Sequence, residues 1–84
     1  MENIFGKISM IYALNVYIMP DYTVFAADLP GCASEGRSIS DCLKQIHEAA
    51  TGILKSYIDN NENIPWKHTE KPLFAEVRQI HIRI

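Results

Sequence analysis

The sequence has few of the residues that mark several large classes of protein. Its 84 residues include two cysteines, Cys32 and Cys42, which are too few for a disulfide scaffold and lack the spacing of a metal site. Four glycines and four prolines exclude a collagen-like or low-complexity chain. Eight basic residues against ten acidic ones give a net charge of −2, so no basic field exists to hold nucleic acid. What remains is an ordinary globular domain that we do not expect to bind nucleic acid directly.

Long hydrophobic runs are also missing. The longest, residues 8–19, contains two polar residues and is shorter than the ~20 residues that a membrane helix needs. It does not fit an export signal either, because Pro20, Asp21 and Asp28 separate it from Cys32. We therefore expect a cytoplasmic protein without a membrane segment, in which both cysteines are small buried side chains.

The residues that are present predict several strands. Residues 9–19 and 22–27 are rich in β-branched and aromatic side chains, and a Pro-Asp turn signal separates them, so they predict a β-hairpin. A short third strand is expected at 32–35. Residues 62–72 contain two prolines and several charges, which indicates an irregular connection. Alternation from residue 73 onward predicts a last strand with Phe74 on its core side.

The long helix is the clearest prediction. From Ile39 to Ile58, apolar residues recur at i, i+3, i+4 and i+7 for about five turns. Ser38 and Asp41 fit a capped helix start, and the Asp-Asn-Asn sequence after Ile58 ends the helix. Gly52, inside the helix, predicts a close approach to the sheet. The order β-β-β-α-β describes one α+β domain spanning residues 1–84, with one long amphipathic helix packed on a mainly antiparallel sheet.

A single helix cannot cover such a sheet on both sides. The helix is ~10 Å wide, whereas four strands spaced ~4.8 Å apart make a broader sheet with two faces. The apolar residues Ile11, Tyr17, Phe25 and Val77 are candidates for the face left uncovered. The sequence therefore predicts an exposed apolar patch that marks a contact site.

One group of residues forms a recognisable motif. Its members are Tyr22, Asp28, Leu29, Pro30, Gly31, Cys32 and Gly36. A capped helix follows, and then Asn63-Ile64-Pro65. Together these features resemble the HicB-like antitoxins of bacterial toxin–antitoxin pairs, over about residues 14–65. Two departures from the family pattern, Ala27 where proline is frequent and Cys42 where alanine is usual, are expected to be tolerable changes in the core.

The resemblance implies a function through binding. Such antitoxins have a partly degraded ribonuclease-H-like fold and no catalytic or cofactor-binding residues. They silence a small, basic, HicA-like ribonuclease toxin that cleaves messenger RNA with a histidine, and they self-associate as dimers or tetramers. Many members add a C-terminal DNA-binding domain. The sequence up to Ile84 contains no such pattern, so the expectation is a single domain without one.

Four residues are candidates for facing a partner: Asp21, Tyr22, Glu35 and Trp66. We expect the antitoxin to mask the toxin with its sheet face or with the segment around Asp21, Tyr22 and Glu35. Trp66 has two open interpretations, as an anchor of the irregular connection against the core or as part of a binding edge, where aromatic residues are enriched.

Two other functions were considered. A residual metal-dependent nuclease would use Asp28 as a metal ligand, but such a site needs several converging carboxylates, and Asp21, Glu35 and Asp41 fall in turns or at a helix start. A turn-forming role, in which the Asp28 side chain accepts backbone N–H groups, is favoured instead. Three histidines are interpreted as surface or packing groups: His47, His68 and His81. The other alternative is a structural or ligand-binding module that retains the fold without a toxin.

Overall fold

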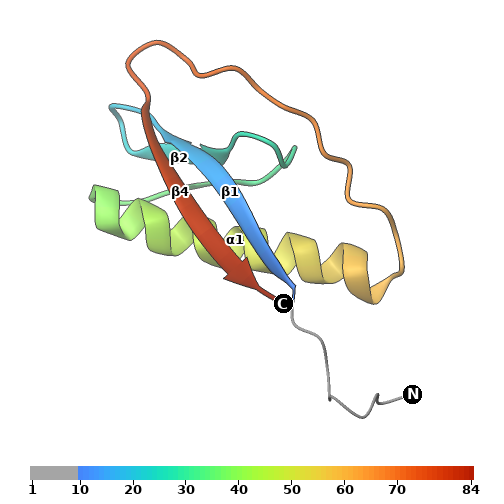
Figure 1. Cartoon of the computed structure of the whole chain (residues 1–84). Helices are drawn as coiled ribbons and strands as arrows, with labels where there is room; N and C mark the ends of the chain where they lie inside the picture. The colour runs from blue at the N-terminus through green and yellow to red at the C-terminus, as the bar shows by residue number, and fades with distance from the viewer. Residues whose placement is uncertain (1–9) are drawn as a thin grey trace.

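The structure is a computed structural model that describes residues 10–84. It contains β1 (Ile11–Ile18), β2 (Thr23–Ala26), β3 (Ala33–Glu35), α1 (Ile39–Asp59) and β4 (Glu76–Arg83), in the predicted order. One long helix lies across one side of a curved sheet, and an extended segment leads from its end back to β4 (Figure 1). The α+β prediction is confirmed.

The sheet is antiparallel throughout, with the strand order β3-β2-β1-β4. The predicted hairpin is present, since β1 pairs with β2 in the register Ile18↔Val24. On its other side β1 pairs along its whole length with β4, from Ile11↔Arg83 to Ile18↔Glu76. The first strand had been predicted to begin at Ser9, which lies outside the described residues.

Helix α1 begins and ends where the sequence indicated. The Ser38 hydroxyl accepts a hydrogen bond from the Asp41 amide at 3.1 Å, and the Asp41 carboxylate accepts one from the Arg37 amide at 2.9 Å. The first bond satisfies an amide that the first helical turn leaves without an intrahelical partner, and the second ties the residue before the N-cap to the helix. At the other end, Asn61 adopts a left-handed backbone with φ 56°, a conformation that Asn tolerates after a helix.

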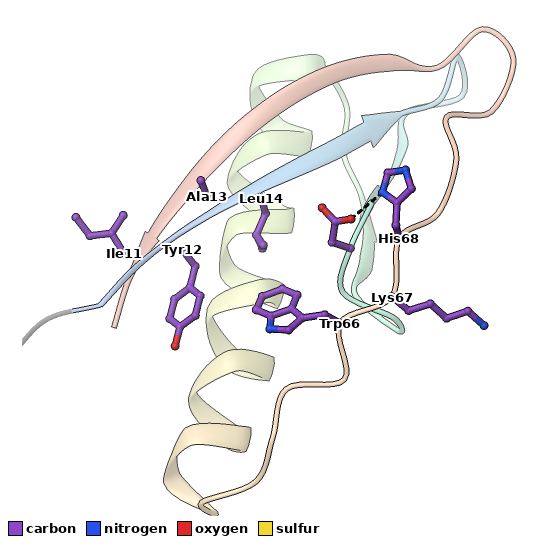
Figure 2. Close-up of a pocket in the computed structure, with 8 residues that line it drawn as sticks. Ile11, Tyr12, Ala13, Leu14, Trp66, Lys67 and His68 are labelled. Carbon is purple, nitrogen blue, oxygen red and sulfur yellow. Dashed lines mark hydrogen bonds and ion pairs between the residues drawn. The ribbon is translucent and has the colours of Figure 1, made fainter.

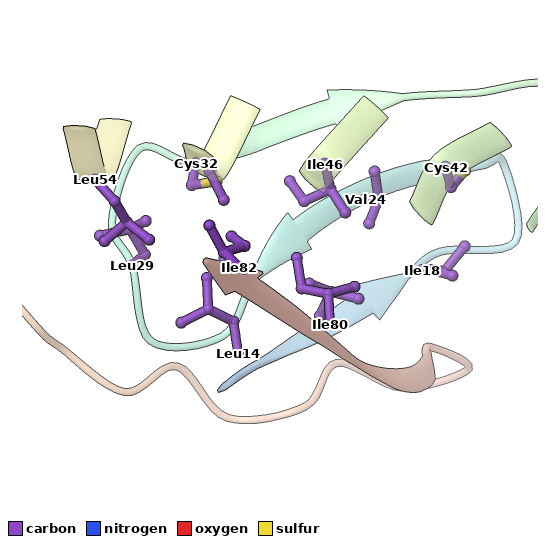
Figure 3. Packing of buried hydrophobic residues seen from close by; sticks show 13 residues of the cluster. Leu14, Ile18, Val24, Leu29, Cys32, Cys42, Ile46, Leu54, Ile80 and Ile82 are labelled. Carbon is purple, nitrogen blue, oxygen red and sulfur yellow. The ribbon is translucent and has the colours of Figure 1, made fainter. Parts of the chain in front are cut away.

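The main core lies between α1 and the near face of the sheet (Figure 3). Alternate residues of β1, such as Leu14 and Val16, pack against the apolar stripe of the helix, including Ile46 and Leu54. The complete buried set is Leu14, Val16, Ile18, Val24, Ala26, Leu29, Cys32, Cys42, Ile46, Ala50, Leu54, Ile80 and Ile82. Burying this stripe, more than intrinsic propensity, stabilises a helix of this length.

The sheet face away from α1, here called the outer face, is not the continuous patch that was predicted. Tyr17 is only 5% exposed and packs with Phe25 at 5.4 Å between ring centroids, in a small second cluster with Ala27 and Ala75. The irregular connection, predicted at residues 62–72, extends to residue 75 in the structure. It shelters this cluster, and its Thr69 backbone oxygen accepts a hydrogen bond from the Tyr17 hydroxyl. That part of the prediction was wrong, since it counted only the helix as cover.

Two other residues of the predicted patch are exposed. Ile11 and Val77 both lie on the outer face and remain largely open to solvent. The outer face is therefore part covered and part open, and its open part also carries polar side chains such as Asn15 and Gln79.

Gly52 and Phe74 also differ from expectation. Gly52 is exposed, and a Cβ built on it would meet nothing within 4 Å, so it does not serve a close approach to the sheet. Phe74 lies in a turn before β4 with its side chain 84% exposed, and not on the core side of a strand. The alternation from residue 73 was extended too far because Pro72 starts a turn there, in which the amide of Ala75 donates to the Pro72 oxygen.

Candidate functional site

The motif Asp28 to Cys32 forms a tight turn after β2. Gly31 takes a left-handed backbone with φ 79°, which favours glycine. The Cys32 amide donates to the Leu29 oxygen at 3.2 Å, and the Cys32 oxygen accepts the Ala26 amide at 3.0 Å. Leu29 and Cys32 are both buried in the main core. The motif therefore turns the chain from β2 into β3, and the buried side chains of Leu29 and Cys32 attach this turn to the main core. This is a structural role.

Asp28 is the polar member of the motif, and its side chain faces an unexpected partner. Its Oδ1 lies 2.8 Å from Nδ1 of His68, forty residues further along the chain. The backbone joins the same two segments, because the Asp28 oxygen accepts the Lys67 amide at 3.0 Å. Asp28 was predicted to bond backbone amides with its side chain, whereas the structure gives it this histidine. The sequence did not predict the Asp28–His68 pair, because the two residues are forty positions apart and no local pattern links them.

The acidic residues considered for a metal site do not converge on Asp28. Asp21 and Asp28 stand at opposite ends of β2, and Glu35 lies near the Asp21 end because it pairs with Thr23. Asp41 is engaged at the start of α1. Within residues 10–84 there is no group of three or more His, Cys, Asp or Glu side chains that could hold a metal ion. The described residues therefore supply no assembled two-metal centre.

The cysteine side chains offer no thiolate. Burial raises the pKa of Cys32 to about 11, and burial likewise raises the pKa of the Cys42 thiol. Cys42 also donates a hydrogen bond through Sγ to the Tyr22 backbone oxygen at 3.2 Å. Both side chains are free cysteines in the core, as predicted, and both stay protonated at neutral pH.

A hollow of about 510 Å³, here called the Trp66 hollow, lies beside the first half of β1 (Figure 2). Its lining residues are Ile11, Tyr12, Ala13, Leu14, Asp28, Trp66, Lys67 and His68. Trp66 stands 6.2 Å from the Tyr12 ring and keeps 47% of its surface exposed. Trp66 therefore packs on Tyr12 as an anchor of the connection and also leaves part of its ring exposed, while its place in a binding edge stays a prediction.

The other three candidates gather at the opposite end of the sheet. Asp21 and Tyr22 form the tip of the β1–β2 hairpin, and Glu35 is brought beside them by the β2–β3 pairing. Hydrogen bonds from the Thr23 hydroxyl and amide lower the pKa of Asp21, so its carboxylate is ionised at neutral pH. Phe74 lines a second hollow at this end, of about 260 Å³, together with Tyr22 and Glu76.

His47 and His81 are a second pair that sequence reasoning kept apart. His47 Nε2 lies 3.1 Å from the backbone oxygen of His81, so a helix side chain reaches the free edge of β4. This contact partly covers an edge that otherwise presents unpaired backbone groups. The periodicity of α1 placed His47 on the helix flank, but only the packing of α1 on the sheet showed which strand it reaches.

Fold and site together define a class: a small α+β domain with one helix on a four-stranded antiparallel sheet. The model of a family described as HicB_like antitoxin of bacterial toxin-antitoxin system matches residues 15–78. The chain belongs to this HicB-like antitoxin family, which confirms the resemblance.

A solved structure supports the fold. The crystal structure of the N-terminal domain of Burkholderia pseudomallei antitoxin HicB matches with a TM-score of 0.64 and 23% sequence identity, covering 87% of this chain and 98% of that one. A search of curated proteins found no match. Within residues 10–84, no helix is both long enough and apolar enough to cross a membrane.

Proposed function

We propose that this chain is the antitoxin of a toxin–antitoxin pair, and that it neutralises a small basic mRNA-cleaving toxin of the HicA-like kind by masking its active site. Family membership over residues 15–78 is the observation that carries the proposal. The antitoxin acts by binding, in the cytoplasm, and performs no chemistry of its own. The separation of Asp28 from Asp21 and Glu35 agrees with this, because a nuclease would need these carboxylates together.

The surface of the domain suits a basic partner. The chain has a net charge of −2, and two of its acids, Asp21 and Glu35, lie together at the hairpin end. Electrostatic complementarity of this modest size affects the choice of partner and the association rate more than the affinity. Of the four partner-facing candidates, Asp21, Tyr22 and Glu35 therefore act as one surface, and Trp66 belongs to another part of the domain. Self-association as a dimer or tetramer completes the proposed assembly.

Co-expression tests the function. The small basic protein encoded beside this chain is expressed alone, with this chain, and with a core-disrupted variant, Ile46→Asp, as the control; Ile46 is fully buried. We expect the toxin to arrest growth and degrade mRNA when alone or with the variant, and the parent chain to relieve both effects and co-purify with it. Continued toxicity in the presence of abundant, folded parent chain would overturn the proposal and leave an orphan module of the same fold.

A further inference from the structure

Two bulky aromatic residues occupy backbone conformations that favour glycine. Tyr22 has φ 65° and Phe74 has φ 66°. For a side chain with a Cβ this left-handed region is strained, and for a bulky residue it is an outlier. Such strain persists only where something else favours the side chain, and it is concentrated at binding and catalytic sites.

Tyr22 stands at the glycine position of a common hairpin loop. Its amide donates to the Met19 oxygen at 2.8 Å, and the Met19 amide donates to the Thr23 oxygen, also at 2.8 Å. This is a four-residue turn whose last residue is left-handed, the pattern of a three-residue hairpin loop in which glycine usually takes the last place. The loop itself therefore gives no reason for a tyrosine.

Phe74 stands at a position of another turn that also favours glycine. The Ala75 amide donates to the Pro72 oxygen at 3.3 Å, which makes Phe74 the third residue of a four-residue turn. A positive φ at this place is met by glycine or asparagine in most proteins. This turn, like the hairpin loop, would form more readily without the aromatic side chain.

The core does not account for these side chains either. Tyr22 is 40% exposed and Phe74 is 84% exposed, and both line the hollow of about 260 Å³ at the hairpin end. Leu73, beside Phe74, is 82% exposed. Tyr22 and Phe74, together with Leu73 next to Phe74 in the chain, are here called the aromatic surface, which lies at the tip of β1–β2 and just before β4. Exposed apolar groups that burial does not explain mark interaction sites.

We propose that the aromatic surface is the place where the toxin binds, with Phe74 and Tyr22 as the anchoring side chains. This rests on the proposed function and adds the site to it. Aromatic residues dominate the energetics of protein interfaces when they enter a pocket on the partner. The acids around the surface, Asp21, Glu35 and Glu76, select a basic partner, and Glu76 is already held by an ion pair with Arg78.

A second copy of this chain fits the aromatic surface less well. A two-fold dimer uses the same patch on both subunits. Here that would bring two sets of acids, including Asp21 and Glu35, against each other, and like charges facing across an interface are unfavourable. The part of the β4 edge that follows Glu76 lies outside the aromatic surface, so self-association can use a separate site.

Glycine substitutions separate binding from folding, because glycine suits both turns. The variants are Tyr22→Gly and Phe74→Gly, and the matched control is Asn61→Gly, which removes the side chain from a third left-handed position, at the end of α1. Each is measured for its thermal midpoint and for its affinity for the toxin encoded beside this chain, with the toxin's catalytic histidine replaced. We expect thermal midpoints equal to or above that of the parent for all three variants.

We expect the affinity for the toxin to fall at least about tenfold in Phe74→Gly and in Tyr22→Gly, because each variant loses an interface hot spot. The affinity of Asn61→Gly should stay unchanged.

The possible results are distinct. Parent-like toxin affinity in both aromatic variants would overturn the binding site and leave the antitoxin function standing. A loss of self-association with unchanged toxin affinity, measured by light scattering, would assign the surface to a second copy and also overturn the proposal. If the parent chain itself does not bind the toxin, the proposed function fails, and the site fails with it.

Discussion

The hydroxyl of Tyr17 donates a hydrogen bond to the backbone oxygen of Thr69 at 2.8 Å, across fifty-two positions of the sequence. Two backbone bonds reinforce it, from the Thr69 amide to Ala27 and from the Lys67 amide to Asp28. The irregular connection is thereby fastened to the end of β2 and over part of the outer face. This contact explains why a sheet with one helix still buries residues on both sides.

Removing that hydroxyl should loosen the connection. Tyr17→Phe is expected to lower the free energy of unfolding by about 1 kcal/mol, since one partly buried hydrogen bond is lost while the ring stays packed. Hydrogen exchange at the Thr69 and Lys67 amides should become faster. Tyr57→Phe is the control, because the Tyr57 hydroxyl makes no hydrogen bond within residues 10–84. Unchanged exchange at both amides would show that the fastening lies elsewhere.

The start of α1 should make stability depend on pH. The amide of Arg37 and the side chain of Gln45 lower the pKa of Asp41 below 3.8, its ordinary value. A carboxylate with a lowered folded-state pKa stabilises the fold above its unfolded pKa, and the stabilisation is lost as pH falls through the folded value. Asp41→Asn should therefore be less stable than the parent at neutral pH and lose less stability below about pH 4.

Denaturant unfolding at neutral and acidic pH measures this effect. Ser38→Ala serves as the comparison, because its hydroxyl accepts the Asp41 amide and does not titrate. It should cost about 0.5–2 kcal/mol at both pH values. An Asp41→Asn variant as sensitive to acid as the parent would assign the acid dependence to other carboxylates, such as Asp21.

Gly36 should be the least replaceable of the three glycines that the structure describes. A Cβ at this position would lie 2.6 Å from the Cys42 backbone nitrogen and 2.9 Å from the Asp41 carbonyl carbon, so the first turn of α1 would have to move. Gly36→Ala is expected to cost about 1–3 kcal/mol through overpacking. Gly31→Ala, which meets nothing within 4 Å and suffers only its φ of 79°, should cost about 1 kcal/mol. Equal costs in chemical denaturation would contradict the close approach at Gly36.

Gly52 should behave in the opposite way. It is exposed in the interior of α1 with open space around it, so Gly52→Ala should stabilise the protein by up to about 1 kcal/mol through helix propensity. The thermal midpoint is expected to rise by about 4–8 °C, the usual shift for a domain of this size. A fall in the midpoint would mean that the helix packs against something at this position in the assembled protein.

Local patterns determined most of the elements. The i, i+3, i+4 spacing and the Ser38–Asp41 cap specified α1, and the Pro-Asp turn between two β-rich stretches specified the hairpin, because these signals act within a few residues. The motif from Asp28 to Cys32 encodes a turn directly through its Pro and Gly, and together with the helix that follows it carried the resemblance to the family. Local signals misled at Phe74, where a turn interrupted the alternation, and at Gly52, whose place inside the helix predicted a close approach to the sheet that the structure does not show.

Tertiary packing decided what no local pattern contains. The pairing of Asp28 with His68, the cover that Thr69 gives to Tyr17, and the meeting of Tyr22 with Phe74 at one hollow all join residues forty or more positions apart. Such contacts depend on the strand order and on the path of the connection. Strand and helix periodicities reveal which face a side chain takes, but only the folded chain determines which other segment that face meets.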